Sequence, residues 1–105
     1  MNDQQIKQQG IKLIKKHEYE KAIELLRTVI KVGDTSEAAA YFVIALIIKK
    51  NKAKAETIFK AWKDKEQPTT AHWLMAEGKI EWFVLGQKNK AVDLMKRVNE
   101  LAPMN

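Results

Sequence analysis

The chain has 105 residues, no cysteine and a net charge of +6 that comes almost entirely from lysine. This length suits one domain with a modest core, and the missing cysteines exclude disulfides, thiolate metal sites and thiol nucleophiles. The polar first ten residues contain no apolar secretory segment, so we expect a cytoplasmic location.

Helical periodicity predicts an all-α chain, since only four glycines and two prolines interrupt it. Asp34, followed three residues later by Glu37, resembles a capping box at the start of a third helix. Asn51 and Gly86 suit the left-handed backbone that closes a helix, whereas His17 is a less usual residue for that place. We predict six helices, over residues 3–16, 19–32, 35–50, 52–65, 69–85 and 88–101.

The third of these helices contains AAAYFVIALII, residues 38–48, which is the least polar stretch of the chain. A bilayer requires about 20 consecutive apolar residues, so this run is too short to cross one. A helix that is apolar on every side is instead typical of a position enclosed by other helices. We therefore expect a buried central helix and no membrane partner.

One apolar stripe occurs three times. It begins at Ala22, Ala55 and Ala91, and apolar residues follow each alanine at the third, fourth and seventh positions. The alanines are separated by 33 and then 36 residues, close to the roughly 34-residue period of arrays of helical hairpins. The spacing predicts three copies of a two-helix unit.

These units resemble the tetratricopeptide repeat (TPR) family, which pairs a helix A with a helix B. Gly10 takes the place of the small residue in helix A, Tyr19 that of the aromatic before helix B, and Pro103 that of the closing proline. The second and third units depart from the pattern at four positions, Val43, Lys52, Lys79 and Lys88, and Gly78 lies one place early. The resemblance implies a single domain over 1–105, a right-handed solenoid of three repeats at about 3–34, 35–67 and 69–103.

In this family the A helices line a concave groove that binds the partner. The resemblance implies a largely apolar groove, because Ile11 and Ile44 stand where co-chaperone members carry asparagines that hold a peptide carboxylate. Such a groove suits an amphipathic helix, and its rim lysines favour acidic residues on that helix. Tight coiling of the chain or its own N-terminal segment are alternative ways to cover the groove. The partner-binding residues would be Lys7, Ile11, Ile14, Lys15, Ala40, Ile44, Ile47, Ile48, Trp73, Ala76, Ile80, Phe83 and Val84.

Three tryptophans are many for a short chain, and tryptophan is enriched at binding hot spots. Trp62 and Trp82 fall on stripes within the repeats and are expected in the core, whereas Trp73 is expected to meet a ligand. The last helix has no capping helix after it, so apolar surface around Val92 and Met95 is a candidate for self-association.

Nothing in the sequence favours catalysis, a metal or a cofactor, since His17, His72 and Ser36 have no evident catalytic partners. We expect a chaperone or adaptor that binds protein, and the chain looks like the needle-subunit chaperones of bacterial type III secretion in size, repeat number and groove polarity. Frequent lysine and isoleucine agree with an AT-rich bacterial or phage genome. A structural homo-oligomer is one alternative. A nucleic-acid-binding repeat that uses Lys49, Lys50, Lys52 and Lys54 is a less favoured one, because arginine is scarce.

Overall fold

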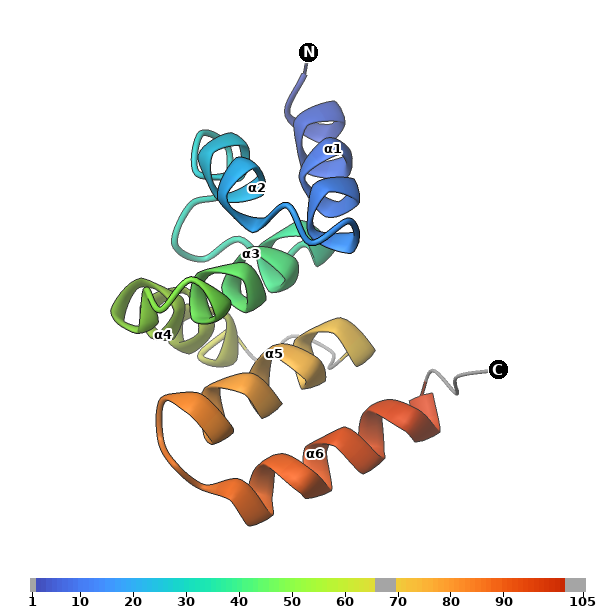
Figure 1. Cartoon of the computed structure of the whole chain (residues 1–105), viewed down its shortest axis with the longest axis vertical. Helices are drawn as coiled ribbons and strands as arrows, with labels where there is room; N and C mark the ends of the chain where they lie inside the picture. The colour runs from blue at the N-terminus through green and yellow to red at the C-terminus, as the bar shows by residue number, and fades with distance from the viewer. Residues whose placement is uncertain (1, 66–69, 102–105) are drawn as a thin grey trace.

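The computed structural model describes residues 2–65 and 70–101, and within them the fold is all-α, without a strand. These residues form six helices that follow one another as hairpins, which confirms the predicted number for the described part of the chain (Figure 1). The Cα radius of gyration is 13.0 Å, as expected for a compact domain of this length. The helices are α1 (Asp3–Lys15), α2 (Tyr19–Leu26), α3 (Glu37–Ile48), α4 (Lys52–Lys63), α5 (Ala71–Phe83) and α6 (Lys88–Leu101).

The second helix is shorter than predicted, ending at Leu26 instead of residue 32. After the C-cap residue Arg27 come Thr28, Val29 and Ile30, whose branched Cβ atoms disfavour a helix. The Thr28 hydroxyl also donates a hydrogen bond to the Leu25 carbonyl at 2.7 Å. Ile30 is nevertheless buried, so its periodic place in the sequence reflected core packing and not a continuing helix.

The start of α3 differs from the predicted capping box. Ser36 is the N-cap, and its hydroxyl accepts a hydrogen bond from the Ala39 N–H at 3.3 Å. Asp34 instead accepts a hydrogen bond from the Ser36 N–H at 2.8 Å and pairs with the Lys7 ammonium at 3.0 Å. It therefore fixes the loop before α3 against α1.

This ion pair gives stability a pH dependence. Burial of the Asp34 carboxylate raises its pKa, but hydrogen bonds from Ser36 and Lys7 and the Lys7 charge outweigh burial, so the pKa lies below its ordinary value. A carboxyl whose pKa is lower in the folded state stabilises the fold above its unfolded pKa, and this contribution is lost as the pH falls through the folded pKa.

We expect Asp34→Asn to lower the free energy of unfolding by about 1 kcal/mol at pH 7, because the charged pairing with Lys7 is lost. As the pH falls below the ordinary carboxyl pKa and through the lower folded pKa of Asp34, the wild-type carboxylate is protonated and the difference should shrink toward zero. Urea denaturation at pH 7 and pH 3 measures both values. Asp93→Asn, at an exposed position of α6, is the control. A difference that is independent of pH would contradict this account of Asp34.

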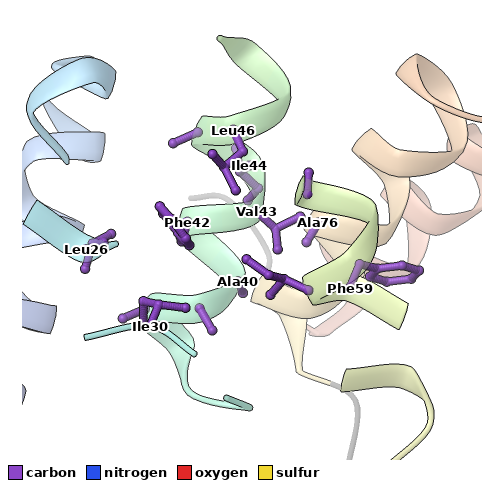
Figure 2. Packing of buried hydrophobic residues seen from close by; sticks show 14 of the residues in the cluster. Leu26, Ile30, Ala40, Phe42, Val43, Ile44, Leu46, Phe59 and Ala76 are labelled. Carbon is purple, nitrogen blue, oxygen red and sulfur yellow. The ribbon is translucent and has the colours of Figure 1, made fainter. Parts of the chain in front are cut away.

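Helix α3 occupies the centre of the molecule, as its apolar sequence predicts. It packs against α1, α2, α4 and α5, and nine of its twelve residues are buried. Figure 2 shows Phe42 on the side of α3 that faces Leu26, and Val43 on the side that faces Ala76. None of the described helices has the length and apolar character that crossing a bilayer requires.

The three turns that join α1 to α2, α3 to α4 and α5 to α6 repeat one backbone feature. His17, Lys50 and Gly86 have φ angles of 62°, 67° and 70°, and each precedes a repeat alanine by five residues. Lys50 therefore takes the left-handed place expected for Asn51, which is instead the N-cap of α4. The alanines are buried at 0%, 0% and 3% exposure, where the two helices of each hairpin approach closely.

The third turn is wider by one residue. After the first two A helices, the N–H of Glu18 bonds the Leu13 carbonyl and that of Asn51 bonds the Leu46 carbonyl, five residues back in each case. After α5, the Gln87 N–H reaches six residues back to the Glu81 carbonyl at 2.7 Å.

The extra residue corrects the predicted register of the third repeat. The reference points are Leu13, Leu46 and Glu81, whose carbonyls accept the hydrogen bonds of the three turns. Three residues before them, the small-residue position holds Gly10, Val43 and Gly78, so in the third unit Gly78 and not Lys79 occupies it. The side chains that face the two glycines support this register. A Cβ on Gly10 would meet Leu26 of α2, and a Cβ on Gly78 would meet Met95 of α6. Leu26 and Met95 each lie four residues after a repeat alanine.

Packing between hairpins follows a simple order. Helix α3 contacts both α1 and α2, and α5 contacts both α3 and α4, whereas α6 contacts α5 alone among the described helices. The main apolar cluster extends from α1 to α5. A smaller cluster formed by Leu74, Leu94 and Val98 joins α6 to α5. The last hairpin therefore has one side that no described helix covers.

Candidate partner-binding surface

Most of the predicted groove is filled by its own side chains. Eight of the thirteen residues belong to the main apolar cluster, where they join the helices to one another. Their exposed fractions are all 7% or less, so they present little surface to a partner. A binding role for them stays a prediction. These eight are Ile11, Ile14, Ala40, Ile44, Ile47, Trp73, Ala76 and Ile80.

The other five predicted groove residues are scattered. Lys7 pairs with Asp34, Lys15 is exposed at the end of α1, and Val84 packs partly buried against the main cluster. Ile48 and Phe83 are the only large apolar residues of the set that are exposed, at 39% and 48%. The structure therefore brings no open apolar channel together from the predicted residues that it describes.

Two of the three tryptophans differ from expectation. Trp73 is buried, stacks on Trp62 with ring centroids 4.5 Å apart, and donates a hydrogen bond from its indole nitrogen to the Thr35 carbonyl at 3.1 Å. Trp82, expected in the core, is 40% exposed. The longer third turn explains why Trp73 is buried and Trp82 exposed. It shifts every position of α5 by one residue relative to the predicted register, so a different face of the helix meets the core.

Large apolar side chains are exposed together on the last hairpin. We call them the C-terminal apolar surface; they are Trp82, Phe83, Leu85, Val92 and Met95, each at least 40% exposed. Between α5 and α6 this surface contains a hollow of about 290 Å³, lined by Gly78, Lys79, Trp82, Phe83, Ala91 and Met95. Of the five, Trp82, Phe83 and Met95 meet around this hollow, and exposed apolar residues gathered in this way are typical of an interaction site.

Lysines lie over the aromatic rings of this surface. The Lys79 ammonium is 5.7 Å from the centroid of the Phe83 ring, and the Lys88 ammonium is 5.4 Å from that of Trp82. The two rings are neighbours, with centroids 6.5 Å apart. Within the described part of the chain neither ammonium is paired with a carboxylate, so the surface combines apolar anchors with available positive charge.

Beside this surface, Glu81 is a buried carboxylate. It takes the place of Leu13 and Leu46 in the earlier repeats, and its exposed fraction is 2%. One of its oxygens lies 3.2 Å from the Lys90 ammonium, and the other has no hydrogen-bond partner among the described residues. Sequence analysis missed this residue, because only the third turn's register identifies its position as a core one.

The histidines lie away from this surface. The His17 imidazole is 2.6 Å from the Tyr19 hydroxyl, and the His72 imidazole is 3.2 Å from the Glu37 carboxylate. His72 therefore has a carboxylate neighbour that its place in the sequence does not indicate. In residues 2–65 and 70–101, no three histidine, aspartate or glutamate side chains gather closely enough to hold a metal ion.

No protein-family model matches the chain, and no curated protein and no solved structure matches it either.

Proposed function

We propose that this chain is a non-enzymatic protein-binding module, a chaperone or adaptor, that holds part of another polypeptide on the C-terminal apolar surface. One observation carries the proposal. Trp82, Phe83 and Met95 surround an open apolar hollow, although residues of this size are usually buried in a monomer. Tryptophan in such a place is also the residue type most enriched at binding hot spots.

The proposed scaffold is a solenoid of three TPR-like hairpins. The repeated left-handed turn at His17, Lys50 and Gly86 supports it, as does the packing of α3 and of α5 on the preceding hairpin. In this proposal the partner-binding surface lies at the end of the array. The buried isoleucines of the predicted groove serve mainly to join the repeats.

Affinity capture from a lysate of the source organism, followed by mass spectrometry, tests the proposal. We expect the wild type to retain one helical protein and the Trp82→Glu variant to lose it. Val32→Glu, in the loop after α2, is the control, since Val32 is also exposed, at 66%. Equal recovery on Trp82→Glu and wild type would refute the proposal.

Light scattering of the pure protein separates this function from a structural homo-oligomer. We expect a monomer in both the wild type and Trp82→Glu. A wild-type dimer that Trp82→Glu dissociates would mean that the C-terminal apolar surface serves self-assembly.

A further inference from the structure

The internal repeat shows what covers a surface of this kind. Met95 corresponds to Leu26 and Phe59, because all three lie four residues after a repeat alanine. Leu26 and Phe59 are 0% and 4% exposed, whereas Met95 is 41% exposed. The position is apolar in all three hairpins but is covered only in the first two.

The A helices repeat this contrast. Leu13, Leu46 and Glu81 are equivalent positions, because their carbonyls accept the turn hydrogen bonds. The residues that directly follow them, Ile14, Ile47 and Trp82, are therefore equivalent as well. The isoleucines are 6% and 4% exposed and Trp82 is 40% exposed. The third hairpin therefore carries apolar side chains at the positions that are buried in the first two.

In the first two hairpins the covering element is a helix. Helix α3 lies on α1 and α2, and α5 lies on α3 and α4, whereas α5 and α6 have no such helix among the described residues (Figure 1). We infer that the C-terminal apolar surface docks an acidic amphipathic helix of a partner protein, which lies on α5 and α6 as a seventh helix. This inference rests on the proposed function and specifies its partner.

Charge selects an acidic helix over a second copy of this chain. The hollow is lined by Lys79 and by no acidic residue, and Lys88 stands over Trp82 at its edge. Two copies meeting through this face would bring these lysines together, in chains that already carry a net charge of +6. A partner helix with carboxylates beside its apolar stripe meets both lysines with opposite charge.

The expected ligand has apolar residues at i, i+3, i+4 and i+7, which is the pattern of a helix held on one face. One or two of these side chains enter the hollow between Phe83 and Met95. Glutamate or aspartate flanks the stripe where it passes Lys79 and Lys88, and draws the ammonium groups away from the aromatic rings.

Selection from a displayed library of random peptides of about 20 residues, on the full chain, tests this inference. We expect the enriched peptides to share the amphipathic spacing and to carry acidic flanks. Synthetic copies of an enriched peptide, with its acidic residues either kept or replaced by lysine, are then titrated by fluorescence anisotropy. The lysine copy is expected to bind at least tenfold more weakly.

Three variants locate the binding. Trp82→Glu and Met95→Glu, on different helices, should each weaken the acidic peptide at least tenfold, and Lys79→Glu should weaken it several-fold and reduce its salt dependence. Ile48→Glu is the control, because Ile48 is as exposed as Trp82 but lies on α3, in the predicted groove. Circular dichroism establishes that each variant is folded.

The outcomes distinguish the inference from the proposed function. The selected peptides could lack the helical spacing or the acidic flanks and yet bind the wild type and not Trp82→Glu. That result would overturn the inference and leave the proposed function standing. Peptides sensitive to Ile48→Glu but indifferent to Trp82→Glu and Met95→Glu would overturn both. A wild-type dimer that the acidic peptide does not dissociate, and that Trp82→Glu does, would identify a second copy as the occupant.

Discussion

Gly10→Ala is expected to destabilise the protein by about 1–3 kcal/mol, although alanine is the better helix former. A Cβ at this position of α1 would lie 2.4 Å from two carbon atoms of Leu26. Leu26 is completely buried, so its side chain cannot move aside into solvent. Overpacking therefore outweighs the gain of about 1 kcal/mol that alanine brings to a helix interior. Urea denaturation followed by circular dichroism measures the difference.

The matched control is Gly78→Ala, at the equivalent position of α5. Its Cβ would lie 3.3 Å from the Met95 sulfur, and the exposed end of that flexible side chain can move. We expect a change between zero and a gain of about 1 kcal/mol. In a Leu26→Ala background the Gly10→Ala clash disappears, so the same substitution should become neutral or stabilising. Gly10→Ala that stabilises the otherwise wild-type chain would contradict the close approach of α1 and α2.

The sequence predicts much of the fold because burial and periodicity agree along most of the chain. The three alanines mark the close approach of paired helices, and the apolar run in α3 marks the centre. The end of α2 was missed for a physical reason. Ile30 continues the apolar periodicity of the helix, yet branched side chains and the Thr28 hydroxyl favour a turn there.

The candidate site was predicted only in part, and one hydrogen bond explains most of the difference. The Gln87 N–H reaches the Glu81 carbonyl, so the turn after α5 contains one residue more before its left-handed Gly86 than the turn after α1 has before His17. This hydrogen bond has no signature in the residue pattern. Aligning the repeats on their alanines therefore placed Phe83 where Trp82 lies. Val92 and Met95, expected from the sequence as apolar surface of the last helix, are both exposed.

The buried Glu81 leads to the second large expected effect. Glu81→Leu should raise the free energy of unfolding by about 2 kcal/mol, because leucine is the residue type at the equivalent positions, where Leu13 is partly buried and Leu46 fully buried. The substitution removes a buried charge with one oxygen unpaired, and the half-exposed Lys90 ammonium can be hydrated instead. Thermal and urea denaturation of the full chain measure the gain.

Lys90→Met provides the opposite test, because it removes the cation and leaves the carboxylate buried. We expect a loss of about 3 kcal/mol, since an unpaired buried charge is among the most destabilising changes in a core. In the double variant Glu81→Leu, Lys90→Met the loss should vanish, which shows that Lys90 acts through Glu81 and not through its own packing. A Glu81→Leu variant with a lower free energy of unfolding than the wild type would contradict this account. The carboxylate would then stabilise the α5–α6 hairpin, and leucine at this position would not have the stabilising role of Leu13 and Leu46.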